Sequence, residues 1–489
     1  MKSIKLALLG GAALAVTAAA AHADDLDALK AQIEALNARV AAMEAAPAVP
    51  AGYSLLAISE GPLSQTPGLP MNNKQLAAYG NEATYISVLP TADAPAGATI
   101  TWSGYVRAGL VYYHNDTKAE LKVRDTNIPG SNGVLFKGEE ENSYDDWDVP
   151  VRGQLRVKAS TDTAVGEVGV DIRLRANFDG NGAGDVYSDV AWGYWSMTPE
   201  LTFGGGYAGS LGNIGYGYDG ACTCYLTDNA DVGFNPGDTT QLRLSYASGP
   251  FSMAVALEDA SVNNTFVGNS GRFNEYNDQL GVAGEIKYSG DVVNGEISGV
   301  WRGRNTDTIF SYFGTDDGWS PDDLWQVGVG IGFALGDMAS LSLAAAMGAG
   351  PFETVAPNSS PAAGDITGGL PVNNTWWGVS GLASANLSDA VHAEIGVGYK
   401  ARDFEERDVT TVLGTWEAGG SYNSFGVLGG IYYDPVDQLT LGVEAEYWTN
   451  DWDNSFTLLD KTGAKTPIKA DLDFTSENFQ VDFVSVWRF

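Results

Sequence analysis

The sequence predicts an all-β fold: a transmembrane antiparallel β-barrel of about 16 strands, preceded by a short N-terminal coiled-coil helix. Three observations carry this prediction. From Thr99 onward, apolar and polar residues alternate with a period of two. The connections between the alternating segments are short and long in turn. A secretory signal precedes them, and no later apolar run is long enough for a spanning helix.

Residues 1–23 have the pattern of a signal peptide. Lys2 and Lys5 give a basic start, a run dominated by Leu, Ala, Gly and Val extends from Leu6 to Ala21, and Ala21-His22-Ala23 offers a cleavage site. A membrane anchor is the alternative, but a run of about 16 residues is shorter than the roughly 20 that a spanning helix needs. We therefore expect the chain to be exported.

Residues 24–46 predict a periplasmic coiled-coil helix, because their apolar residues recur at steps of three and four. Leu26, Ile33 and Val40 fall at heptad position a, and Leu29, Leu36 and Met43 at position d. Fewer than three full heptads make a marginal helix alone. We expect it to be tethered to something already oligomeric.

Residues 47–98 are rich in Pro, Gly and Ala and predict a linker. The prolines are Pro47, Pro50, Pro62, Pro67, Pro70, Pro90 and Pro95. Such a composition disfavours both helix and sheet. The more apolar part from Tyr79 to Leu89 is expected to pack against the barrel or to enter it.

Residues 99–489 predict the barrel itself. In the first strand Trp102, Val106 and Leu110 fall on one face, and Thr101 and Arg107 on the other. We count about sixteen such segments, each close to the 9–11 residues that cross a membrane as a tilted strand. They are 100–113, 149–159, 165–177, 190–197, 201–208, 239–248, 251–259, 278–289, 295–303, 325–334, 338–348, 376–387, 390–402, 421–433, 438–448 and 476–489.

The connections fall into two sets. The short set comprises 160–163, 198–200, 248–250, 335–337, 387–389 and 434–437. The long, acidic set comprises 114–148, 209–238, 304–324, 349–375 and 449–475. This alternation is typical of outer-membrane barrels. A soluble β-sandwich is the alternative, but nothing would place all of its long loops at one end. Lipid excludes open sheet edges, and this forces the sheet to close.

The composition agrees with this class. The chain has 61 Gly, 13 Trp and 22 Tyr, with 18% charged residues, as expected for a barrel with aromatic girdles. The formal net charge is −34; removing Lys2 and Lys5 leaves 25 basic residues against 61 acidic ones, or −36. Such a surface excludes nucleic acid as a partner, because phosphate contacts need clustered Lys and Arg.

The chain resembles the porins of alphaproteobacteria. The residues that carry the resemblance are the opening strand Trp102-Ser103-Gly104-Tyr105-Val106-Arg107-Ala108-Gly109, the terminal Trp487-Arg488-Phe489, and the long segment after the fifth strand; the likeness covers 99–489. The family implies a water-filled channel in the Gram-negative outer membrane, assembled as a homotrimer of sixteen-stranded barrels. Ile and Val at a with Leu at d would alone favour two strands, so the trimer is expected from the barrel.

The resemblance also implies that residues 209–238 fold into the barrel as a constriction. This loop is Gly-rich and carries Asp219, Asp228, Asp231 and Asp238. The inward faces of the strands carry basic residues: Arg107, Arg152, Arg156, Lys158, Arg173, Arg175 and Arg243. We predict that this basic wall faces the acidic loop and sets a transverse field across the pore. The alternative is that the inward Arg residues only hydrogen-bond neighbouring strands and loops.

Catalysis and cofactors are not predicted. Beyond the signal peptide only His114 and His392 occur, and neither lies in a recognisable nucleophile setting, so we expect no enzyme. The acidic stretches 139–148 and 315–323 could bind Ca²⁺, although neither has the ligand spacing of an EF-hand loop. We expect no other metal. Cys222 and Cys224 could form a local disulfide or remain two free thiols.

The leading functional hypothesis is passive diffusion of ions and small hydrophilic solutes. Two alternatives stay open: a channel selective for anions or sugars, and a structural protein that ties the outer membrane to the cell wall through residues 24–46. Outer-membrane lipid and lipopolysaccharide are the expected surroundings, and the acidic loops could bridge to lipopolysaccharide phosphates through cations.

Overall fold

The computed structural model describes residues 55–89, 98–128, 133–178, 184–259, 263–264, 273–274, 280–303, 323–353, 371–411, 414–460 and 462–489. The features below belong to the unit formed by Leu56–Leu89 and Ala96–Phe489. The predicted signal peptide (1–23) and coiled coil (24–46) lie outside the described residues.

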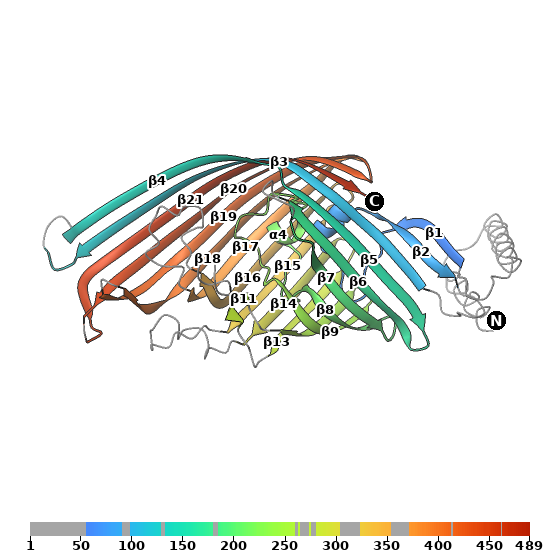
Figure 1. The fold of residues 1–489 in the computed structure, drawn as a ribbon, viewed down its shortest axis with the longest axis horizontal. Coiled ribbons are helices and arrows are strands. Elements are labelled where there is room, and N and C mark those ends of the chain that lie inside the picture. Colours follow the sequence, from blue (N-terminus) through green and yellow to red (C-terminus); the bar gives the residue numbers. More distant parts are fainter. Residues whose placement is uncertain are drawn as a thin grey trace, which may run out of the picture. The chain divides into compact units, whose positions relative to one another are not determined.

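Strands dominate this unit (Figure 1). In chain order the elements are β1 (Leu55–Pro62), α3 (Asn73–Tyr79), β2 (Glu82–Leu89), β3 (Ala98–Asp125), β4 (Val134–Asp148), β5 (Val151–Thr163), β6 (Gly166–Phe178), β7 (Tyr187–Ser196), β8 (Leu201–Gly209), α4 (Gly217–Ala221), β9 (Asp238–Ser248), β10 (Phe251–Asp259), β11 (Asn263–Asn264), β12 (Phe273–Asn274), β13 (Leu280–Ser289), β14 (Val293–Arg302), β15 (Leu324–Ala334), β16 (Ala339–Glu353), β17 (Pro371–Ser388), β18 (Val391–Thr411), β19 (Gly414–Val436), β20 (Leu439–Leu459) and β21 (Lys465–Arg488). Among the described residues, no helix has both the length and the apolar character needed to cross a membrane.

Nineteen of the strands belong to one sheet, and this sheet closes on itself. Each strand from β5 to β21 pairs antiparallel with the next one of the ring, and β21 pairs with β3, as in the register Asn478↔Asn115. β4 and β5 lie end to end along β3 and form one stave, interrupted at Val149–Pro150 because proline cannot donate to the ladder. β2 pairs only with the first residues of β3, and β1 pairs with β2, so neither strand is counted in the ring. Sixteen staves make the ring, which confirms the predicted barrel.

The period-two pattern sorts side chains between the two faces as predicted. On β3, Trp102 and Val106 point outward and are 37% and 45% exposed, whereas Thr101 and Ser103 point inward and are buried. The same exposed apolar face continues around the ring, so large hydrophobic side chains cover the outside and polar ones line the inside. This is the reverse of a soluble core and fits an apolar surrounding.

Two of the predicted long loops, 114–148 and 449–475, are mostly strand instead. β3 runs on to Asp125 and returns as β4 from Val134, and β20 runs to Leu459 before β21 starts at Lys465. The prediction missed them because it limited each strand to the 9–11 residues that cross a membrane, although 118–124 still alternates polar with apolar residues. Their backbone hydrogen bonds are still satisfied by the hairpin ladder.

The predicted linker is also wrong for the part of 47–98 that the structure describes. It contains β1, α3 and β2, and β2 pairs with the first residues of β3 in the register Ile86↔Ile100. Of the described prolines, Pro62 ends β1, and Pro67 and Pro70 lie between β1 and α3. Asn72 and Gln75 form a reciprocal capping box at the start of α3, and Gly80 ends it with a φ of 77°.

The outward apolar band can be tested by a charge at its centre. Ile297 lies in the middle of β14 and is 58% exposed on the outer face. Ile297→Arg should lower the free energy of unfolding in lipid vesicles by about 2–4 kcal/mol, because the charge enters the hydrocarbon. Ser455→Arg, on the exposed extension of β20, is the matched control and should change it little. Urea titrations that give equal losses for both variants would contradict the band.

Candidate functional site

Residues 209–238, here the inner loop, lie inside the barrel. Between Ser210 and Ala230, the loop hydrogen-bonds to inward side chains of β10, β14, β16, β17, β18 and β20. A loop that reaches strands so far apart in the ring must cross the lumen. These contacts therefore agree with the predicted inward folding of the loop.

The anchors of the inner loop are mainly carboxylates. Glu258 accepts from Ser210 Oγ at 2.7 Å, Glu394 from the backbone N–H of Thr223 at 3.0 Å, and Glu444 from that of Tyr225 at 2.8 Å. Glu296 and Glu446 bind the loop N–H groups of Gly215, Asn229 and Ala230 in the same way. An irregular segment leaves many N–H groups without backbone partners, and the acidic wall satisfies them.

A second stretch lies inside the barrel: residues 63–80, here the N-terminal segment. Its carbonyls face the basic wall that the sequence predicted. Arg156 donates to Ser64 O at 2.8 Å, Lys158 to Gln65 O at 2.7 Å, and Arg243 to Gly68 O at 3.1 Å. In both inner segments carbonyls are held by cations, as Tyr225 O of the inner loop is by Arg107, whereas the carboxylates hold N–H groups of the inner loop.

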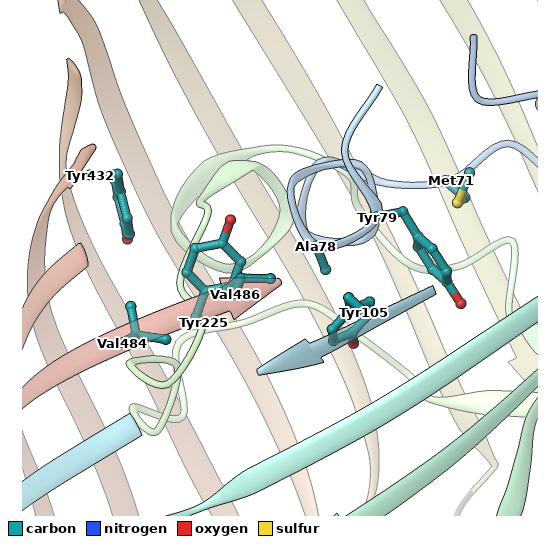
Figure 2. Packing of buried hydrophobic residues seen from close by; sticks show 8 residues of the cluster. All are labelled: Met71, Ala78, Tyr79, Tyr105, Tyr225, Tyr432, Val484 and Val486. Atoms are coloured by element: carbon teal, nitrogen blue, oxygen red, sulfur yellow. The ribbon is translucent and has the colours of Figure 1, made fainter. Parts of the chain in front are cut away.

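The C-terminal strand fixes the helix of this N-terminal segment. Arg488 donates to the last carbonyls of α3, to Ala77 O at 2.6 Å and to Ala78 O at 3.1 Å. A cation at a helix C-terminus satisfies orphan carbonyls and the helix dipole. Figure 2 shows Tyr79 of α3 beside Tyr105 of β3, and the rings meet edge to face with centroids 5.3 Å apart. Val484, Val486 and Tyr225 belong to the same cluster of buried hydrophobic residues.

The two inner segments meet at Lys74. Its ammonium lies 2.6 Å from Asp219 and 2.7 Å from Asp228 of the inner loop. Burial lowers the pKa of Lys74, but the two carboxylates outweigh it, so the pKa is raised above the ordinary value and the lysine stays charged. One lysine and two aspartates leave a formal excess of one negative charge where the lumen is narrowed from both sides.

A second charged contact lies further along the inner loop. Asp231 pairs with Lys400 at 3.2 Å and Arg402 at 3.0 Å, both on the inner face of β18. Burial raises the pKa of the Asp231 carboxyl, but the two cations outweigh it and the net pKa is lowered. Here the formal excess is one positive charge.

The described contacts engage the predicted basic wall with neighbouring strands and inner segments rather than with the predicted aspartates of the inner loop. Arg156 and Arg173 are almost fully buried and share the carboxylate of Asp171, at 3.0 Å each. Arg175 pairs with Asp189, Arg152 donates to Asn177, and Arg107 donates to Tyr225 O. The inward basic residues therefore hold strands and inner segments, which was the alternative reading, because a buried cation must be paired where it lies.

Three of the four predicted acidic residues lie in contacts across the lumen. The prediction for Asp238 needs correction: it is the exposed first residue of β9, opposite Gly209, where the loop leaves the wall. Sequence reasoning missed Lys74, Asp171 and Arg402 as partners. Glu258, Glu394 and Lys400 stand on the polar faces of their alternating strands, so a count of inward acids as well as bases could have found the anchors.

The other candidate groups have local roles. A disulfide joins Cys222 and Cys224 inside the inner loop, which decides between the two alternatives. His114 pairs with Asp145 at 2.8 Å, and His392 pairs with Asp434 at 3.1 Å and stacks on Tyr432. The acidic stretch 139–148 forms β4, while most of 315–323 lies outside the described residues. Within the described part of the chain, no group of three or more His, Cys, Asp or Glu residues is arranged to hold a metal ion.

No family model and no curated protein sequence matches the chain. Among solved structures, the outer membrane channel DcaP of Acinetobacter baumannii has 14% identity and a TM-score of 0.43, over 80% of this chain and 97% of that one. The outer-membrane expressed OmpT of Vibrio cholerae has 12% identity and a TM-score of 0.44, over 80% and 98%. An anion-selective porin from Comamonas acidovorans has 10% identity and a TM-score of 0.42, over 80% and 100%. Likenesses this distant do not assign a function, which must be inferred from the chain's own side chains.

Arg156 and Arg152 should respond differently to substitution. Arg156→Met removes a buried cation from Asp171 and from the N-terminal segment, and should lower the free energy of unfolding by about 3 kcal/mol. Arg152→Met, at a partly exposed side chain, should change it by less than about 0.5 kcal/mol. Glutamate at both positions should therefore destabilise the barrel rather than only shift ion preference. Equal urea midpoints for the two methionine variants would contradict the buried anchor.

Lys74 should control the local charge of the narrowed lumen. Lys74→Met leaves Asp219 and Asp228 without their common cation. The cation-to-anion permeability ratio should rise about tenfold, because a unit charge at about 6 Å in water shifts cations and anions by about 0.7 kcal/mol each, in opposite directions. The reversal potential across a salt gradient in a planar bilayer measures this ratio. Lys118→Met, at an exposed pair with Glu141, is the control; an identical shift there would show that only overall charge matters.

Proposed function

We propose that this protein is an outer-membrane porin, a water-filled channel for passive diffusion of ions and small hydrophilic solutes. The observation that carries the proposal is the closed barrel of sixteen staves with an apolar outside and a polar, charged inside. Closure satisfies every strand edge, as lipid requires. A ring of this size has an aqueous bore rather than a packed interior.

The narrow part of the channel is built by the inner loop and the N-terminal segment together. Each is fixed to the wall by charge-assisted hydrogen bonds, and Lys74 joins them. Two contacts leave charge excesses of opposite sign, at Lys74 with its two aspartates and at Asp231 with its two cations. The carboxylates of Glu394, Glu444 and Glu446 accept from uncharged donors, which do not cancel their charge. A polar and charged lining of this kind supports passage of ions and small hydrophilic solutes.

We further propose a homotrimer of the alphaproteobacterial porin type. The opening strand Trp102–Gly109 and the terminal Trp487-Arg488-Phe489 support the family, and a trimer follows from it. In the membrane orientation expected for such a porin, the short turns and the predicted coiled coil face the periplasm. The exposed carboxylates of β4, among them Glu139 and Glu140, then lie outside, where cations can bridge them to lipopolysaccharide phosphates.

The proposal predicts discrete conductance steps when the purified protein is added to a planar bilayer. Replacing residues 219–231 by Gly-Gly should raise the single-channel conductance, on the order of twofold, because the bore left by sixteen staves is wide. The matched control replaces 122–137 by Asn-Gly, which shortens the β3–β4 hairpin outside the lumen with a standard two-residue turn. Absence of any conductance steps would refute the proposed channel. Equal conductance in both variants would show that the inner loop does not form the constriction.

A further inference from the structure

β4 has a free edge at the long-loop end of the barrel (Figure 1). Its other edge pairs with β3, in registers such as Tyr113↔Asp146. β5 continues the same stave, but the next strand of the ring, β6, ends at Phe178 opposite Val151 and so reaches β5 only. Within the described part of the chain, no strand pairs with the second edge of β4, and this edge is therefore open to another strand.

The free edge offers backbone hydrogen-bonding groups along its length. In an antiparallel pair, every second residue directs its N–H and C=O away from the partner strand. β4 has 15 residues, and all of them are exposed except Gly138 and Asp148, which are half-buried. Unpaired groups of this kind are a template onto which an extended chain can add as a further strand.

β4 is acidic on both of its faces. It carries six carboxylates and a single cation, Lys137. Because successive side chains of a strand point to opposite faces, three carboxylates lie on each face. Glu139, Glu141 and Asp145 share one face with Trp147, and Glu140, Asp146 and Asp148 share the other with Tyr144. We name these the Trp147 face and the Tyr144 face.

The two faces differ in how their carboxylates are compensated. On the Trp147 face each has a basic partner: Glu139 pairs with Lys137, Glu141 with Lys118 at 3.2 Å, and Asp145 with His114 at 2.8 Å. On the Tyr144 face Glu140 accepts from Asn142 at 3.2 Å, and Asp146 and Asp148 accept from the next backbone N–H at 2.8 Å and 2.7 Å. Among the described residues these three have no cation, so the Tyr144 face keeps three uncompensated negative charges.

Two aromatic rings lie among these charges. Phe136 and Tyr144 belong to the Tyr144 face and are 54% and 40% exposed. Tyr144 also packs on Tyr113 of β3, with ring centroids 5.6 Å apart, which supports its ring from the barrel side. The long stems of Lys and Arg pack well on exposed rings, and their charged ends are attracted to the ring faces.

We propose that the free edge of β4 binds an extended cationic peptide as an added strand; this rests on the proposed channel, whose orientation turns this end to the cell exterior. The peptide backbone would pair with the unpaired N–H and C=O groups of β4. Side chains directly opposite each other on neighbouring strands lie about 5 Å apart. Lys or Arg side chains of the peptide would therefore reach Glu140, Asp146 and Asp148.

Charge decides between this partner and a second copy of the chain. Pairing β4 with β4 of another copy would bring two sets of six carboxylates together, and like charges on adjacent strands are destabilising. Charges on an edge strand generally prevent such pairing between identical chains. For a partner of opposite sign the same carboxylates attract and select.

Fluorescence anisotropy of a labelled peptide tests the site. The probe has about 12 residues of alternating Thr and Lys, enough to cover most of β4, and is titrated with the full-length protein in a neutral detergent. We expect saturable binding that added salt weakens. Glu140→Gln combined with Asp146→Asn should weaken the affinity about fivefold, the effect expected for two exposed ion pairs.

Two controls are matched to this variant. Asp451→Asn combined with Asp453→Asn removes the same charge from exposed positions of β20, a strand whose two edges are both paired, and should leave the affinity unchanged. A peptide of alternating Pro and Lys has the same charge but lacks every second backbone donor, and should show no saturable binding.

The outcomes separate this proposal from the channel itself. Equal weakening in the β4 and β20 variants, or equal binding of the two peptides, would show diffuse attraction to an acidic chain and overturn the site. Unchanged binding in the β4 variant would overturn it as well. A lower native mass of the β4 variant, with no peptide bound by the unaltered protein, would show that a second copy covers the edge. Absence of conductance steps in a planar bilayer would refute the proposed function instead, because peptide binding is measured separately in detergent.

Discussion

The lumen of this barrel is organised by one constraint: irregular backbone placed inside a ring must find hydrogen-bond partners on the wall. The inner loop has N–H groups without backbone partners, and these donate hydrogen bonds to Glu258, Glu394 and Glu444 on the wall. The N-terminal segment has carbonyl groups that accept hydrogen bonds from Arg156 and Arg243 on the wall. Charged side chains do this well because a hydrogen bond to an ionised group is stronger than one between neutral groups. The sign of the charge on each part of the wall thus follows from which backbone atoms it must hold.

This constraint changes what the lumen charges mean for permeation. Most of them are engaged as anchors, such as Arg173 with Asp171 inside the wall. A paired and buried charge contributes little to the field that a solute meets, because its partner lies about 3 Å away. What the solute meets is the remainder: one negative excess at Lys74, one positive excess at Lys400, and the wall glutamates that anchor the inner loop through neutral N–H groups. The formal charge of −34 therefore does not by itself give the charge of the constriction.

The sequence was sufficient to predict the barrel but not the contacts between the wall and the segments inside it. Alternation with a period of two placed Trp102 outward and Arg156 inward correctly, because a strand has only two faces. It could not show that Arg156 would be covered by residues 64–66, since nothing local marks a distant partner. The extension of β3 to Asp125 was missed because each strand was limited to the length that crosses a membrane, although Ala119, Leu121 and Val123 continue the apolar face. The capping box at Asn72 and Gln75 can be read in the sequence, but the prediction considered only the surrounding prolines.

The inner loop and the wall at β17 and β18 depend on each other through Phe234 and Asp231. Phe234 stacks on Trp376 of β17, and Asp231, three residues earlier, pairs with Arg402 of β18. Displacing the loop would therefore remove the stacking partner of Trp376 and leave the buried Arg402 without this carboxylate. A buried cation needs its partner, so the contacts that hold the constriction in place also keep this part of the wall satisfied.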